Sequence, residues 1–384
     1  MDYEMKSKNG TTITRVACAV FFLLFSFIYL FYYQDNLLYV LQHTLSKGST
    51  TYNRAIGAVL IVVLLWLVHA LLVATTRLRL QAYALTYFPS FLLLGVLCDV
   101  GPDGGASHYP GNWVWLLPLL LLLYAGVVWV CRQLESIAQQ NTPRGIFSRS
   151  GWGNMLLMVL MALMTGCIGN NNDLLHFQAK MENQMRKGHY DKALEAGRQS
   201  LETDSTLTLL RVWALSEEGR LGEALFTYPL VGKSDALLPN GHSVRLLLLN
   251  DVELYRHLGV YFKQKMRPRQ YLEKLHERHF ATKAAHDWLL CAYLLDGSLD
   301  KFVKVLPRYY QVNDSLPTHY REALILYTHL KEHPAIVYHD TVMDADFEDW
   351  IQLSRKYSDK TEQNSMLRDS YGKTYWYYYK TIHN

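Results

Sequence analysis

Two segments of the chain have the residue types that bind metal ions, but not the spacing. His276 and His279 stand three positions apart in HERH, whereas a zinc-protease helix needs two histidines four apart so that both face one metal. The acidic segment 340–350, DTVMDADFEDW, lacks the central glycine and the closing bidentate glutamate of a calcium-binding loop. We therefore interpret HERH as part of a solvated helix and segment 340–350 as a solvated surface or the start of a helix.

Other signatures of catalysis or cofactor binding are missing from the sequence. There is no phosphate-binding loop with its lysine, no G-x-S-x-G turn and no dinucleotide-binding fingerprint. Asp99 and Asp103 lie in DVGPDGGASHYPGN, where we expect them to form turns rather than to ligate a cation. The five cysteines form no disulfide pattern, and a net charge of +4 is too diffuse for a nucleic-acid surface. We therefore expect no metal, no cofactor and no nucleic-acid partner.

Cys167 is the first of two residues for which the sequence supports a chemical hypothesis. It closes the segment MTGC, in which Arg149 supplies a positive flank, residues 155–164 an apolar core and Gly166 the small residue before the cysteine. The segment resembles the signal of bacterial lipoproteins, and that resemblance implies lipidation of Cys167. The alternative is a short membrane-spanning helix in which Gly166 and Cys167 are packing residues. Both interpretations place the chain from residue 170 onward in the same compartment.

Asp35 is the second such residue, because it directly follows the first apolar run in the segment FYYQDN. This position resembles that of an acidic residue in the first outer loop of membrane glycosyltransferases that use polyprenyl-linked sugar donors. Some of those enzymes also join their membrane domain to tetratricopeptide repeats. The resemblance implies a catalytic role for Asp35, whereas the alternative is an interfacial helix cap.

Five apolar runs fill the first 168 residues and must position both of these side chains. They cover residues 13–33, 55–75, 82–100, 113–131 and 152–168. A helix of about 20 residues crosses a ~30 Å hydrocarbon core, so we predict a multi-pass membrane domain over residues 1–168. Pro89 and Pro118 predict kinks in the third and fourth spans rather than breaks. His69 in the second run is interpreted as a packed or snorkelling side chain rather than as part of a polar pathway.

Lysine and arginine residues near the ends of the runs indicate the orientation. If the N-terminus is cytoplasmic, eight of them lie on the inner side, namely Lys6, Lys8, Arg15, Arg77, Arg79, Arg132, Arg144 and Arg149. Only Lys47 and Arg54 then lie on the outer side. The positive-inside rule therefore predicts a bacterial inner-membrane protein with residues 171–384 in the periplasm. The leucines of segment 36–45 share one helical face, which we expect to lie along the outer interface.

Beyond residue 170, a glycine, a tyrosine or leucine, and an alanine recur with the spacing G-x-[YL]-x-x-A. The copies are Gly188, Tyr190 and Ala193, then Gly219, Leu221 and Ala224, and finally Gly297 and Leu299 with Phe302 in place of the alanine. This pattern resembles tetratricopeptide repeats, and the glycines of the first two copies are separated by about that family's period. The resemblance covers residues 174 to about 310.

The resemblance implies a stack of antiparallel helix hairpins over residues 171–384. In such a hairpin the glycine lets the first helix end and turn, and the alanine permits close approach of the second helix. We therefore predict an all-α fold: about five transmembrane helices followed by a tetratricopeptide-like α-solenoid. The tyrosine-rich segment DSYGKTYWYYYK is expected to form a helix that caps the open end.

Binding is the usual role of a helical solenoid, because its concave and convex faces are suited to peptides and proteins. The main hypothesis is a non-enzymatic membrane protein that recruits a protein or peptide on the extracytoplasmic side. The alternative hypothesis is a polyprenyl-sugar transferase that uses Asp35.

Overall fold

The computed structural model describes residues 2–76, 78, 80–105, 109–137, 148–357 and 359–383. Within these ranges the regular structure is helical and contains no strand, which confirms the all-α prediction. By their internal contacts the residues form two compact units, 1–176 and 177–384.

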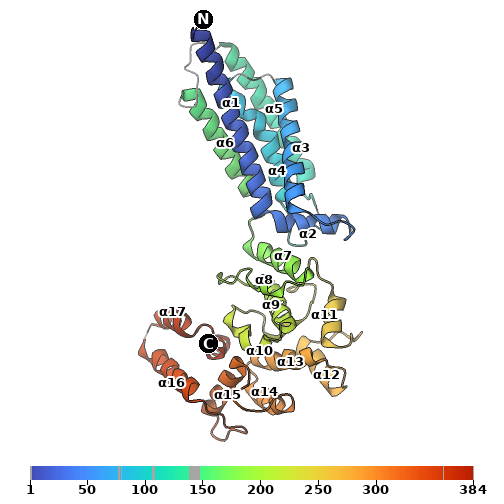
Figure 1. Ribbon diagram of the computed structural model, residues 1–384, viewed down its shortest axis with the longest axis vertical. Coiled ribbons are helices and arrows are strands. Elements are labelled where there is room, and N and C mark those ends of the chain that lie inside the picture. The colour runs from blue at the N-terminus through green and yellow to red at the C-terminus, as the bar shows by residue number, and fades with distance from the viewer. Residues whose placement is uncertain are drawn as a thin grey trace. The chain divides into compact units, whose positions relative to one another are not determined.

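The N-terminal unit is a bundle of helices that run side by side (Figure 1). Its elements are α1 (Asp2–Ile28), the π-helix η1 (Tyr29–Tyr33), α2 (Asp35–Leu45), α3 (Arg54–Thr76), the 3₁₀-helix η2 (Leu80–Tyr87), α4 (Phe88–Cys98), α5 (Trp113–Ile137) and α6 (Arg149–Ile168). Four helical segments are long and apolar enough to cross a membrane: Thr12–Tyr33, Arg54–Thr76, Trp113–Leu134 and Arg149–Ile168. These segments indicate a membrane protein.

The third predicted run does not form one long α-helix. Ala82–Cys98 is a shorter apolar segment in which η2, broken at Ala82, leads into α4. Pro89 lies in the first turn of α4, where its missing N–H has no intrahelical partner to lose. The predicted kink at Pro89 within a continuous span is therefore wrong, because the α-helix begins there. Pro118, by contrast, lies inside the continuous α5.

The short helix α4 is the most enclosed helix of this bundle. It packs against α3, α6 and η2. Its buried residues are Pro89, Ser90, Phe91, Leu92, Leu94, Gly95, Val96 and Cys98. The large exposed apolar side chains belong mainly to α1, α3, α5 and α6. These four helices therefore supply the surface that suits lipid, while α4 is covered by protein.

Three hydrogen bonds join η2 and α4 to neighbouring helices. The bonds are Ala84 N–H to Asn154 Oδ1 at 2.7 Å, Thr165 Oγ1–H to the Phe91 carbonyl at 3.0 Å and Ser90 Oγ–H to the Leu65 carbonyl at 2.8 Å. Such bonds matter in an apolar bundle because water is not there to replace them. His69 is also buried and stacks on Tyr87 with 3.7 Å between ring centroids, so the packed interpretation is confirmed.

Helix α2 lies across one end of the bundle (Figure 1). The five consecutive residues 37–41 are all buried, whereas Leu45 is 58% exposed. A helix that only rested one face on an interface would not bury five residues in a row, since these span every direction around its axis. Residues 37–41 of α2 are therefore enclosed by protein on every side, and the position of this helix along the outer interface stays a prediction.

The C-terminal unit consists of short helices joined by tight turns. Its elements are α7 (Asp173–Arg186), which begins in the preceding unit, α8 (Tyr190–Leu194), α9 (Ser205–Glu217), α10 (Leu221–Ala224), η3 (Leu225–Thr227), η4 (Lys233–Leu237), α11 (Asp251–Leu258), α12 (Pro268–Glu277), α13 (Lys283–Leu295), α14 (Leu299–Val305), η5 (Leu306–Arg308), α15 (Thr318–Leu330), α16 (Thr341–Lys356), α17 (Lys360–Tyr371) and α18 (Tyr375–His383).

Hairpins in this unit pair a long helix with a much shorter one. Helices α7, α9 and α13 have 14, 13 and 13 residues, whereas their followers α8, α10 and α14 have 5, 4 and 7. The α9–α10 hairpin packs directly on α13 and α15. In sequence, residues 225–282, which contain α11 and α12, separate α10 from α13. The unit is thus a helical-repeat-like fold with shortened second helices.

The tyrosine-rich C-terminal segment forms α18, which packs on α15 and α17. Tyr375 and Trp376 are buried. The Tyr375 N–H donates to Glu322 Oε2 at 2.7 Å, and Trp376 Nε1–H donates to the Glu322 carbonyl at 2.8 Å. The last helix is therefore anchored on α15 and α17.

Candidate functional site

The three predicted repeat glycines occupy the same backbone conformation. Gly188, Gly219 and Gly297 have φ values of 73°, 66° and 66°, in the left-handed region that favours glycine. In each turn the next residue donates its N–H to the carbonyl five positions back: His189 to Gln184 at 3.0 Å, Arg220 to Leu215 at 2.9 Å and Ser298 to Tyr293 at 2.8 Å. This geometry is the Schellman ending of a helix, so the motif marks helix ends.

The other motif positions serve packing rather than chemistry. The side chains of Ala193, Leu221, Ala224 and Leu299 are buried, and Tyr190 is half-buried. A fourth turn of the same kind ends α12, where His279 has φ 58° and the Phe280 N–H bonds the Leu275 carbonyl at 2.9 Å. The sequence pattern missed this turn because histidine, not glycine, occupies the left-handed position.

The HERH segment lies at the end of α12 and is only partly solvated. His276 is half-buried, and its Nδ1–H donates to the Leu272 carbonyl at 2.7 Å. Its ring centroid is 5.3 Å from that of His286, which stacks on Tyr309 at 4.1 Å. The prediction of a solvated helix is therefore wrong for His276. Throughout the part of the chain that the structure describes, no three His, Cys, Asp or Glu residues form a metal-binding group.

The acidic segment 340–350 begins a helix. Asp340 caps α16 by accepting the N–H groups of Val342 and Met343 at 3.0 and 3.1 Å. Its carboxylate also pairs with Arg321 at 3.2 Å. The interpretation of this segment as a helix start is confirmed.

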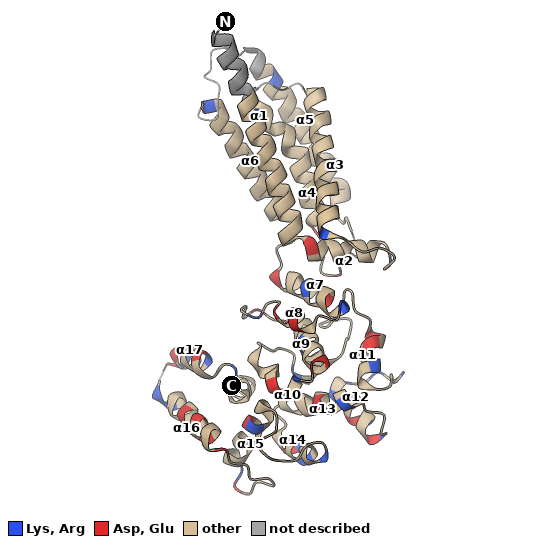
Figure 2. Ribbon diagram, in the orientation of Figure 1, with Lys and Arg blue, Asp and Glu red and all other residues tan. Residues whose placement is uncertain are grey.

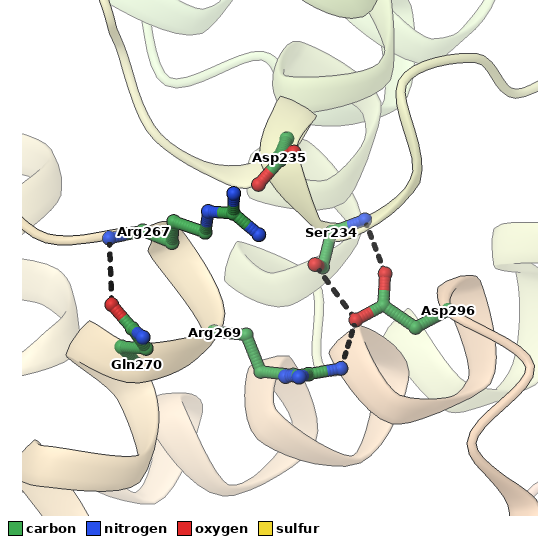
Figure 3. A pocket seen from close by; sticks show the side chains of 6 residues that line it. All are labelled: Ser234, Asp235, Arg267, Arg269, Gln270 and Asp296. Atoms are coloured by element: carbon green, nitrogen blue, oxygen red, sulfur yellow. Dashed lines mark hydrogen bonds and ion pairs between the residues drawn. The ribbon is translucent and has the colours of Figure 1, made fainter.

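A cavity of about 140 Å³ opens where α12 meets η4 and the end of α13. Asp296 is held there by the backbone and the hydroxyl of Ser234 and by Arg269, whose Nη1 is 2.6 Å from Oδ2 (Figure 3). Arg267 extends toward Asp235 (Figure 3), but no hydrogen bond or ion pair of its guanidinium is found among the described residues. The cavity thus contains the Arg269–Asp296 ion pair together with the Arg267 guanidinium and the Asp235 carboxylate.

A second cavity, of about 380 Å³, lies along the same helix and shares Gln270 with the first. It is lined by Gln264, Met266, Gln270, Glu273, Lys274, Glu277 and Arg278. Lys274 and Arg278 both lie over the Phe262 ring, 5.4 and 5.9 Å from its centroid. Together the two cavities line α12 with four acidic and four basic side chains, so the recessed surface is charged but balanced.

Sequence reasoning did not find this surface. Ser234, Arg269 and Asp296 are separated by tens of residues, and no motif links them. The one local signal was the density of cations in KQKMRPRQ, residues 263–270, which lead into the first turn of α12. That signal shows charge but not which of the charges are already paired.

The environment of Asp35 combines a helix start with an unusual turn. Asp35 begins α2, and only Gln34 separates it from η1, a π-helix that ends α1. The Asp35 Oδ1 atom accepts from Asn36 Nδ2 at 2.8 Å. The neighbouring Gln34 is fully buried and donates to Tyr29 Oη and to the Asn170 carbonyl at 3.0 and 3.2 Å. The Gln34 Oε1 atom has no hydrogen-bond partner. π-Helical turns occur often at functional sites.

Cys167 lies in the last turn of α6, which continues to Ile168. Its thiol side chain is exposed, whereas Cys98 is buried, and both are free cysteines. The exposed thiol of Cys167 suits modification, and the uninterrupted helix suits a membrane span.

One buried carboxylate of the C-terminal unit is fully engaged in structure. Glu182 on α7 accepts the N–H groups of Leu247, Leu248 and Leu249 and the side-chain amide of Gln178. Burial raises its pKa, although these donors oppose the shift. Because its lone pairs are occupied, Glu182 holds segment 245–249 onto α7 and is no candidate for acid–base chemistry.

Comparisons with known proteins give a family but no activity. No curated protein and no solved structure matches the chain. Residues 106–262 and 255–382 match the family described as "Family of unknown function (DUF6057)". These two matches cover more than half of the sequence, including α5, α6 and most of the C-terminal unit. The chain therefore belongs to the DUF6057 family.

Proposed function

We propose that this protein is an integral inner-membrane protein whose residues 171–384 form a tetratricopeptide-like binding domain in the periplasm. The domain binds a protein or peptide segment, and the bound segment lies along α12. The observation that carries the proposal is the recessed surface on α12, where two cavities that share Gln270 present charged side chains, among them Arg267, whose guanidinium forms no ion pair among the described residues.

The repeated helix endings support a binding domain. Three hairpins share one Schellman turn, as units of a repeat do. The short second helices of these hairpins are compatible with a degenerate tetratricopeptide array. Such arrays present a surface rather than a catalytic centre.

The proposed orientation rests on the cation bias and on a fifth crossing by Ala82–Cys98. A 3₁₀-helix rises about 2.0 Å per residue and an α-helix 1.5 Å, so this segment extends about 28 Å. That length is close to the ~30 Å of a hydrocarbon core. Because α4 is covered by other helices, its length does not have to equal the thickness of the hydrocarbon core.

Photo-crosslinking in intact cells tests the binding role. A photoreactive residue replaces Lys274, which lines the larger cavity, and a control replaces Glu195, which is exposed in the turn that follows α8. We expect protein adducts at position 274 that are absent at 195 and that Arg267→Glu reduces at least tenfold. Equal adducts at both positions, or none at 274, would overturn the proposal.

A polyprenyl-sugar transferase is the second candidate, and the π-helix that ends at Tyr33, two residues before Asp35, favours it. Asp35→Asn removes the charge and retains the shape of the side chain. Loss of a surface glycan in this variant supports the transferase, and an unchanged glycan profile excludes Asp35 as its catalytic group.

A further inference from the structure

The smaller cavity, where α12 meets η4, contains two charged side chains of opposite sign that are not paired. It is lined by Ser234, Asp235, Arg267, Arg269, Gln270 and Asp296. The Asp296 carboxylate accepts from the Ser234 N–H at 3.1 Å and hydroxyl at 2.9 Å, and it pairs with Arg269 at 2.6 Å. Among the described residues, neither the Arg267 guanidinium nor the Asp235 carboxylate forms a hydrogen bond or an ion pair. One cation and one anion in this cavity are therefore available to a ligand.

These two side chains reach the cavity from different elements. Asp235 belongs to η4, and Arg267 immediately precedes α12. The Arg267 N–H donates to Gln270 Oε1 at 3.4 Å, which ties this residue to the first turn of the helix. In Figure 3 the guanidinium extends toward the Asp235 carboxylate, yet no ion pair joins the two groups. The opposite charges thus line one cavity without neutralising each other.

The size and the lining of this cavity limit what can occupy it. Its volume is about 140 Å³, whereas a single water needs about 10–15 Å³ and drug-sized ligands occupy about 300–1,000 Å³. All of its lining residues are polar or charged. An apolar group would remove water from these side chains and give them no hydrogen bond in return, which is unfavourable. The fitting occupant is therefore a small polar molecule.

The balance of charge selects among small polar molecules. A simple anion would pair with Arg267 but would also lie near the carboxylate of Asp235, and a simple cation would meet the reverse arrangement. Figure 2 shows acidic and basic residues interspersed along α12, so the helix beside the cavity favours neither sign. A molecule that carries one anionic and one cationic group satisfies both side chains at once.

We propose that this cavity binds the zwitterion of a free α-amino acid. The carboxylate of the amino acid accepts from the Arg267 guanidinium, whose planar donors match a carboxylate, and its ammonium group donates to Asp235. Helix α12 begins at Pro268, so the positive end of its dipole lies beside Arg267 and also favours the carboxylate there. The inference goes beyond the proposed function, because a small molecule and not a protein segment fills the smaller cavity.

Thermal unfolding of the full-length protein in detergent tests the proposal. Glycine and the standard L-amino acids are added one at a time up to about 10 mM at constant ionic strength, since a ligand that binds only the folded state raises the melting temperature. We expect a saturable rise with at least one of them. The N-acetyl derivative of that amino acid lacks the ammonium group and its amide lacks the carboxylate, so both should bind at least tenfold more weakly.

Two variants and a matched control assign the binding to this cavity. Arg267→Gln and Asp235→Asn each remove one charge and keep a polar side chain, so each should weaken the binding at least tenfold. Lys265→Gln removes an exposed cation that does not line the cavity, so it should bind like the wild type. All three positions are exposed, so the melting temperatures without ligand should stay close to that of the wild type.

Three results overturn the amino-acid proposal: no amino acid raises the melting temperature, a derivative with one charge binds as tightly as its amino acid, or the Arg267→Gln and Asp235→Asn variants bind like the wild type. The photo-crosslink at position 274 reports on the larger cavity and is a separate outcome. Adducts there without amino-acid binding remove this inference and leave the proposed function standing. Amino-acid binding without adducts at position 274 does the reverse.

Discussion

Glu182 and Leu248 are joined by one of the shorter hydrogen bonds of the C-terminal unit, with 2.6 Å between the carboxylate Oε2 and the backbone nitrogen. Both residues are buried, and the same carboxylate also accepts from Leu247 and Leu249. A side chain of α7 thus replaces the regular backbone partners that segment 245–249 lacks. A buried N–H without an acceptor is costly, so this bond determines where the segment lies.

Replacement of this carboxylate is therefore expected to destabilise the unit. In Glu182→Gln an amide NH₂ faces N–H donors in place of an acceptor oxygen, and we expect unfolding free energy to fall by about 2 kcal/mol or more. Thermal unfolding in detergent, followed by circular dichroism, measures the change. Glu195→Gln, at an exposed position, should stay within about 0.5 kcal/mol of the wild type, and equal effects would contradict the buried clamp.

The turn at Gly219 gives a prediction about backbone conformation alone. An added Cβ would meet nothing within 4 Å, so the cost of Gly219→Ala comes from φ 66° rather than from a clash. We expect a loss of about 1 kcal/mol in unfolding free energy. Gly219→Asn should cost less, because asparagine tolerates the left-handed region. Hydrogen exchange of α9 and α10 measures both variants, and an equal cost for Ala and Asn would argue against this explanation.

Three half-buried histidines predict acid sensitivity of the C-terminal unit. Burial lowers the pKa of His257, His276 and His286 below the usual value. The unfolded chain then binds more protons than the folded one between the folded pKa values and about 6.5, so stability falls as pH falls through this range. Each group contributes a slope of at most about 1.4 kcal/mol per pH unit.

His286→Phe tests the predicted loss of stability at low pH, because phenylalanine keeps the stacking on Tyr309 and removes the titrating group. Melting temperatures measured from pH 7 to pH 5 should decrease less steeply in the variant than in the wild type. A variant that loses as much stability on acidification as the wild type would show that other groups cause the sensitivity.

If Ala82–Cys98 crosses the membrane, the side of the membrane on which two loops lie can be predicted. If this segment crosses, residue 49 before α3 and residue 171 after α6 lie on the same side of the membrane. In a cysteine-free background, Ser49→Cys and Asn171→Cys should both react with a membrane-impermeant maleimide added to the periplasmic side. Reaction of only one of them would mean four crossings instead of five.

Local sequence patterns determined the helices and their ends. Long apolar runs produced four segments that can span a membrane, because length and hydropathy are properties of contiguous residues. Gly188, Gly219 and Gly297 marked helix ends for the same local reason, since only the residue itself must tolerate a positive φ. Asp340 was a helix start because a cap bonds N–H groups two and three positions away.

The tertiary structure alone decided which of these elements enclose which, and which charges remain unpaired. Ala82–Cys98 reads as a span like the others, yet α4 is buried, because burial depends on neighbours distant in sequence. Arg267 and Arg269 are two residues apart and chemically equal, but only Arg269 meets the carboxylate of Asp296. That difference arises from the packing of α12 against η4 and α13, which brings residues distant in sequence together.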